Sequence, residues 1–146
     1  MTVLTPVLFL HVLAAAAWLG AALWTPGDVR RTLALGRPHV EALLGRAAPT
    51  LALDLWAGAV TLLTGIAAIG LEGGVPRIGI LVGFAAALVR LGLAALGLRP
   101  AFRRVAAAVA GGDLAAAQAP ARRLAMISGM GHLLWVVALA GMVFPF

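Results

Sequence analysis

The sequence predicts an all-α fold, an integral membrane four-helix bundle, and its composition and hydropathy pattern both point to it. Of the 146 residues, 63% are hydrophobic and only 11% are charged, and the mean hydropathy is +1.07. A chain this apolar cannot be an ordinary water-soluble domain, so lipid must surround most of its surface. Four apolar segments of about 20 residues are each long enough to cross the ~30 Å hydrocarbon core once as a helix. We therefore expect a single transmembrane domain over residues 1–146.

The four predicted spans lie at about 5–24, 49–70, 78–98 and 124–146. The first span lacks a basic region before it and a convincing cleavage site after it, so we expect it to be retained rather than removed as a signal peptide. The second and third spans are joined only by the short turn LEGGVPR. Short connections place consecutive helices side by side in opposite directions, which predicts an up-down-up-down bundle.

Small residues recur along one face of the second and third spans. The face of the second span carries Asp54, Gly58, Thr61 and Gly65. The face of the third span carries Gly79, Gly83, Ala86, Ala87, Arg90, Ala94 and Gly97. Because small residues let helices in lipid approach closely, both faces should point into the bundle.

The basic residues predict how the chain is oriented in the membrane. All 11 are arginines, and nine lie in the two long connections, 25–48 and 99–123: Arg30, Arg31, Arg37, Arg46, Arg99, Arg103, Arg104, Arg122 and Arg123. The short turn has only Arg77, near Glu72. By the positive-inside rule, both long connections are cytoplasmic loops and both termini are outside. We read the net charge of +6 as a topology signal and expect no nucleic-acid partner. Either loop can hold a short amphipathic helix on the anionic inner leaflet.

Four ionisable residues fall inside the predicted spans, where an unpaired charge costs several kcal/mol. With a helical rise of about 1.5 Å per residue, Arg90, His132 and Asp54 lie roughly 17–24 Å below the outer ends, and His11 lies only about 9 Å below. The buried polar cluster of Asp54, Arg90 and His132 therefore forms one level. Asp54 and Arg90 are interpreted first as a structural ion pair. The functional alternative is an anchor for a carboxylate or propionate, or one step of a proton path.

The two histidines differ in the neighbours their own helices offer. His132 is expected to bond to Ser128, one turn earlier, or to Asp54 on the second span. The helix face of His11 offers no side-chain acceptor, which makes ligation of a flat cofactor a serious alternative to simple packing. Trp18 lies seven residues later on the same face and would form a wall for a porphyrin.

Composition excludes several other kinds of site. With no Cys, the chain has no redox dithiol, thiolate metal site or covalently attached c-type haem, and with no Lys it has no retinal Schiff base. A copper site would use soft ligands, and the alternative metal ligands are Met126 and Met130, one turn apart on the last span, with His132, which is nearby in sequence but on another side of the helix. Methionine in an apolar helix is more often a packing residue.

The first span, LFLHVLAAAAWLGAALWTPGDVRR, resembles the opening helix of a superfamily of small bacterial membrane proteins. This superfamily includes HemJ-type protoporphyrinogen oxidase and copper resistance protein D. The shared pattern is His11, six residues, Trp18 and then Gly20, and looser similarity extends through LLTGIAAIG, LRPAFRRVAAAVAGGD and HLLWVVALAGMVF. The resemblance implies a multi-pass protein of the bacterial inner membrane. On the HemJ side it implies a metal-binding oxidoreductase with haem b and His11 as the ligand of the haem iron. On the copper side it implies copper handling by His11 and the methionines.

Three functional hypotheses follow. The first is an inner-membrane b-type haem protein with a redox role, in which His11 ligates iron, Trp18 lines the pocket and Arg90 pairs with a propionate. The second is a copper-handling or small-solute transport protein with Asp54, Arg90 and His132 along its path, which with so few helices would require a homo-oligomer. The third is a structural subunit or assembly factor that docks on a membrane protein partner.

Overall fold

The structure is a computed structural model that describes residues 2–144, and every regular element in this range is helical. The elements are α1 (Leu4–Leu35), α2 (His39–Glu72), α3 (Ile78–Leu93), the π-helical segment η1 (Ala94–Leu98), α4 (Arg99–Ala110) and α5 (Gln118–Val143). Because α3, η1 and α4 follow one another without a break, residues 78–110 form one long helix. The described chain therefore contains four helices that are long and apolar enough to cross a membrane, which confirms the predicted all-α fold and its four candidate spans.

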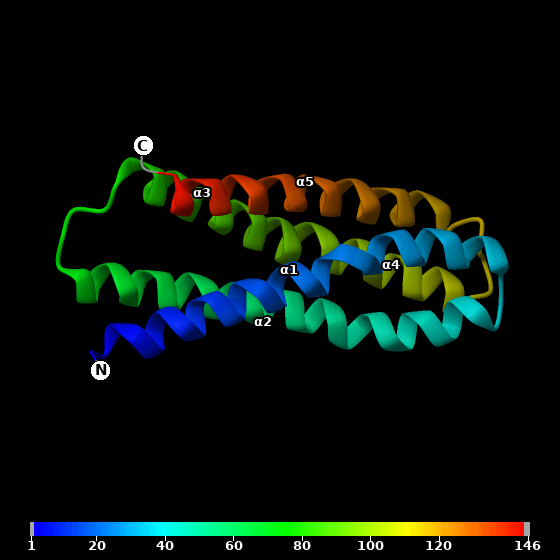
Figure 1. Ribbon diagram of the computed structural model, residues 1–146. Helices are drawn as coiled ribbons and strands as arrows, with labels where there is room; N and C mark the ends of the chain where they lie inside the picture. The colour runs from blue at the N-terminus through cyan, green and yellow to red at the C-terminus, as the bar shows by residue number, and fades with distance from the viewer. Residues whose placement is uncertain (1, 145–146) are drawn as a thin grey trace.

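The long helices lie side by side as an elongated bundle, and Figure 1 shows which segments share each end. The start of α1, the end of α5 and the α2–α3 connection lie together at what we call the pocket end. The connections at residues 36–38 and 111–117 lie together at the opposite end, called the arginine end.

The expected loops 25–48 and 99–123 are mostly helical in the structure. α1 continues to Leu35 and α2 begins at His39, so only residues 36–38 separate them. α4 likewise continues to Ala110. The helices continue because apolar side chains still recur every three or four residues there and keep a buried face, while the intervening alanines and arginines favour helix.

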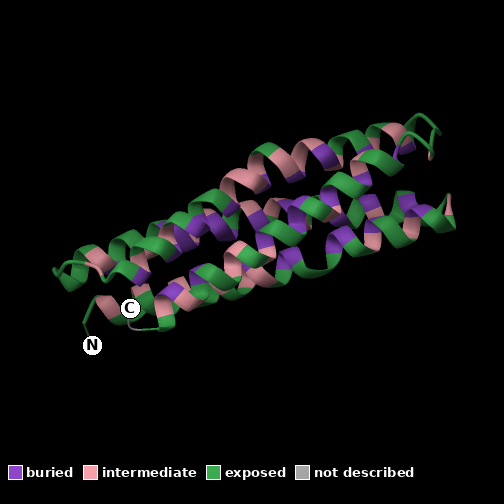
Figure 2. Cartoon of the chain, turned by 90° about the horizontal axis from the view of Figure 1, so that it is seen from above, coloured by how far each residue is buried: buried purple, intermediate pink, exposed green. Residues whose placement is uncertain are grey.

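The arginine end has a tightly packed core of its own. Val29, Val40, Val105 and Leu124 come from the four long helices and are completely buried there. The nine arginines predicted to be cytoplasmic surround this core; Arg99 is half-buried and the rest are exposed. In Figure 2 the buried residues follow the inner faces of the helices through the middle of the bundle and toward the arginine end.

The helices pack as two pairs, α1 with α2 and α3 with α5. In the second pair, a Cβ atom added to Gly83 would lie 2.8 Å from the carbonyl oxygen of Ala138, and one added to Gly141 would collide with the carbonyl group of Gly79. The small residues therefore allow the two backbones to approach, as expected for helices in lipid. Every residue of the two small-residue faces predicted from the sequence is buried or half-buried.

Candidate functional site

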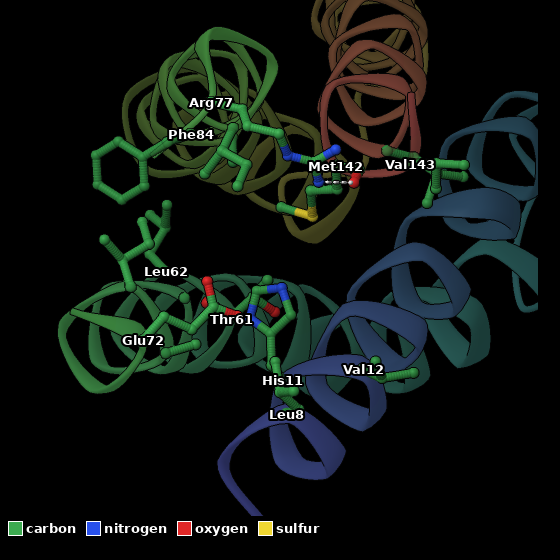
Figure 3. A pocket seen from close by; sticks show the side chains of 16 residues that line it. Leu8, His11, Val12, Thr61, Leu62, Glu72, Arg77, Phe84, Met142 and Val143 are labelled. Atoms are coloured by element: carbon green, nitrogen blue, oxygen red, sulfur yellow. Dashed lines mark hydrogen bonds between the residues drawn. The ribbon is translucent and has the colours of Figure 1, made fainter. Parts of the chain in front are cut away.

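A pocket of about 370 Å³ opens between the two helix pairs at the pocket end. Its volume is within the range of about 300–1,000 Å³ that is typical of small-molecule and cofactor sites. All four long helices contribute to its walls, which are mainly apolar and include Leu62, Phe84 and Leu139. Glu72 and Arg77, at the α2–α3 connection, are the ionisable residues of its wall besides His11 (Figure 3).

His11 projects from α1 into the space between the helix pairs (Figure 3). Its Nδ1 atom lies 2.9 Å from the backbone carbonyl oxygen of Thr61 and 3.1 Å from Thr64 Oγ1. A carbonyl oxygen can only accept, so Nδ1 carries the proton and donates it. In the neutral ring this leaves a lone pair on Nε2, which Figure 3 shows on the side of the ring that faces the pocket.

The position of the His11 ring depends on small and polar residues of α2. A Cβ atom added to Gly65 would lie 3.2 Å from His11 Cε1, so this glycine leaves the space that the imidazole occupies. Thr64 Oγ1 donates to the carbonyl oxygen of Val60 at 2.7 Å, which leaves its lone pairs for the proton on Nδ1. The acceptors missing from the helix face of His11 therefore come from the neighbouring helix.

Arg77 begins the opposite wall of the pocket, just before α3. Its Nη2 atom donates weakly to the carbonyl oxygen of Met142 at 3.5 Å, and the side chain is exposed. Figure 3 shows Arg77 and Met142 across the pocket from His11. From the sequence, Arg77 was predicted only to lie in the short turn opposite the arginine-rich loops, and not to be a site residue. Its position just before a predicted span, near Glu72, was the available sign that a cation lies at the pocket end.

A second polar site lies deeper in the bundle and contains a buried ion pair. Arg90 Nη2 donates to Asp54 Oδ1 at 2.8 Å, and both side chains are 3% exposed. The guanidinium carbon of Arg90 lies 4.0 Å from the ring centroid of Trp18, which is 2% exposed. Gly58 makes room for this ring, because a Cβ atom there would lie 2.6 Å from Trp18 Cε2. We call Asp54, Arg90 and Trp18 the Arg90 layer.

The structure does not bring Trp18 and Arg90 to the pocket that His11 lines. Trp18 lies about two helical turns, or ~11 Å, from His11 along α1. Its ring faces Gly58 and Arg90 rather than a space large enough for a porphyrin. The wall expected from Trp18 is provided instead by aliphatic and aromatic side chains, Phe84 among them.

His132 makes neither of its expected hydrogen bonds within residues 2–144. Its Nε2 atom and Ser128 Oγ are both buried without a partner there. Met126 and Met130 are 62% and 50% exposed on the outside of α5, whereas His132 Nε2 is buried. The alternative ligand set of Met126, Met130 and His132 is therefore not gathered around one point, and neither methionine lines the pocket of His11. The described residues also contain no group of three or more His, Asp or Glu side chains that could hold a metal ion.

Comparison with known proteins adds no family assignment: no protein-family profile, curated protein or solved structure matches this chain.

Proposed function

We propose that this chain is a b-type haem-binding protein of the bacterial inner membrane with a redox role, and that His11 is the axial ligand. The observation that carries the proposal is the hydrogen bond from His11 Nδ1 to the Thr61 carbonyl oxygen, which leaves the Nε2 lone pair facing a pocket of about 370 Å³. Histidines that bind metals characteristically donate their other ring proton to a carbonyl or carboxylate oxygen.

The remaining pocket residues fit the same cofactor. Leu62, Phe84 and Leu139 offer apolar contact to a macrocycle and exclude water from it. Arg77 is a cation at the edge of the pocket, where it would pair with a propionate in place of Arg90. Thr61 and Thr64 hold the imidazole in one orientation and increase its basicity. A bound haem would supply one-electron chemistry at its iron.

The copper alternative has less support, because its methionines face outward and its histidine does not accompany them. The transport alternative needs a polar path through the bundle. The Arg90 layer instead pairs its charges internally, and the arginine end beyond it is closed by completely buried side chains. A purely structural subunit would not require a histidine held in one orientation beside a pocket.

We further propose that the bundle is up-down-up-down, with both termini and the pocket outside and the arginine end in the cytoplasm. Nine of the 11 arginines support this orientation. Trp24 is largely exposed on the outside of α1, as expected of a side chain near a membrane interface. The 32 residues of α1 span about 48 Å, so ~18 Å of the bundle would project beyond a 30 Å hydrocarbon core.

The absence of native cysteine allows a direct test of this orientation. In intact spheroplasts, a membrane-impermeant maleimide should label Gly74→Cys, in the α2–α3 connection, and should not label Asp113→Cys at the arginine end. Labelling of Asp113→Cys alone would reverse the proposed topology.

The haem proposal is tested by the absorption spectrum of protein purified in mild detergent after expression with haem supplied. We expect a Soret band that His11→Ala abolishes. The matched control is His132→Ala, which removes the other intramembrane histidine and should leave the band unchanged. A colourless wild-type preparation, or an unchanged band in His11→Ala, would contradict the proposal.

A further inference from the structure

A small cavity of about 10 Å³ lies beside the Arg90 layer, between α1, α3 and α5. Arg90, Ser128 and Gly131 line it together with apolar side chains such as Ile127. A cavity of roughly 10–15 Å³, measured as the space for water-sized probes, holds one water molecule if polar partners are present. The size of the cavity therefore limits any occupant to about a single water.

Two buried polar side chains at this cavity have hydrogen-bonding capacity that residues 2–144 do not satisfy. Arg90 is 3% exposed, and its Nε and Nη1 atoms have no partner. Ser128 is 4% exposed, and its Oγ atom has none. A guanidinium has five N–H donors, and the bond to Asp54 uses one of them. In the interior of a membrane protein, such groups strongly favour an internal partner.

Gly131 keeps one edge of the guanidinium open toward α5. A Cβ atom at this position would lie 3.7 Å from Arg90 Cγ and 3.8 Å from Arg90 Nε, in ordinary contact with the side chain. The cavity also borders η1, which contributes Ala94 and Leu98. Proline cannot donate to the carbonyl four residues earlier, so Pro100 accounts for the irregular helix at this point.

We propose that this cavity binds one water molecule that accepts a hydrogen bond from Arg90 and bonds to Ser128 Oγ. An anion is disfavoured, because Asp54 already neutralises Arg90 and the cavity has room for little more than one water. The water completes a polar bridge from Asp54 on α2, through Arg90 on α3, to Ser128 on α5. The bridge joins the two helix pairs below the pocket, and it does not depend on haem binding.

Radiolytic hydroxyl-radical footprinting in ¹⁸O-labelled water tests this site, because a trapped water oxidises the side chains beside it even when bulk solvent does not reach them. Ile127 lines the cavity, whereas Leu124 is completely buried one turn away and does not line it. In the wild type, Ile127 should be oxidised several-fold more than Leu124. Equal oxidation of the two residues in the wild type would overturn the proposal.

Two variants remove the water by different routes. Gly131→Ala places a methyl group in the cavity without a clash, and Ser128→Val removes the hydroxyl and adds bulk. In Gly131→Ala, oxidation of Ile127 should fall to the level seen at Leu124. Folded Ser128→Val should give the same result. Undiminished Ile127 oxidation in folded Gly131→Ala would assign the labelling to bulk solvent and refute the water site.

Discussion

Replacing Asp54 with leucine should destabilise the bundle more than most single substitutions, because it leaves the charge of Arg90 without a counterion. Both side chains are 3% exposed, and Arg90 Nη2 lies 2.8 Å from Asp54 Oδ1. Removing one partner of a buried ion pair costs about 3–5 kcal/mol. The Trp18 ring contacts the guanidinium in both proteins, so the cation keeps this one partner when the carboxylate is removed. We therefore expect Asp54→Leu to lower the free energy of unfolding by about 3 kcal/mol, the lower end of this range.

The double substitution Asp54→Leu with Arg90→Met separates pairing from side-chain size. Because it removes both charges and keeps apolar volume, its stability should lie within about 1–2 kcal/mol of the wild type. The assay is equilibrium unfolding in mixed micelles with increasing SDS, followed by tryptophan fluorescence. Leu53→Ala, on the lipid-facing side of the same turn of α2, is the control for changes in the helix itself.

The comparison between the double variant and Asp54→Leu tests the role of the ion pair. A double variant clearly more stable than Asp54→Leu alone would show that the unpaired Arg90 is what destabilises the single variant. If the double variant is as unstable as the single variant, or less stable, the ion pair does not account for the presence of these residues.

Three further predictions concern helix packing and the His11 pocket. Gly141→Ala should lower the free energy of unfolding by about 1–3 kcal/mol, because the new methyl group meets a backbone carbonyl of α3. The control Gly129→Ala, with open space around it, should leave stability unchanged or raise it by up to ~1 kcal/mol. Equal effects of the two variants in SDS unfolding would refute the close contact. Thr64→Val should weaken haem binding about 10-fold or more by removing an acceptor from His11 Nδ1, and Thr64→Ser should restore it; haem titration in which both variants match the wild type would contradict this role. Gly65→Leu should displace the His11 ring and reduce the Soret band without unfolding the protein, and an unchanged band would place the haem elsewhere.

The four apolar helices could be predicted from the sequence because hydropathy depends on composition over a window of about 20 residues. The lengths of these helices could not be predicted in the same way. The residues after Trp24 become polar enough to suggest a loop, yet Val29 and Leu33 keep a buried face, and α1 continues to Leu35. A hydropathy window averages over the arginines and does not detect this alternation, whereas packing against neighbouring helices depends on it.

The two polar sites differed in how far the sequence could predict them. Estimated depth placed Asp54 and Arg90 near one level, and in the structure the two side chains meet. The rotation of α1 against α2 could not be obtained from either helix alone. This rotation supplies His11 with the Thr61 carbonyl and turns Trp18 toward Arg90. Backbone carbonyl acceptors also leave no side-chain signature in a sequence.

The most direct test of His11 as an axial ligand is chemical rescue of His11→Gly. This substitution removes the imidazole and leaves a space beside Gly65 that free imidazole can enter. After expression with haem supplied, the wild type should show a Soret band, His11→Gly should lack it, and added imidazole should restore it in the variant. A His11→Gly protein that keeps the wild-type spectrum without imidazole, or a wild type with no Soret band, would contradict the assignment.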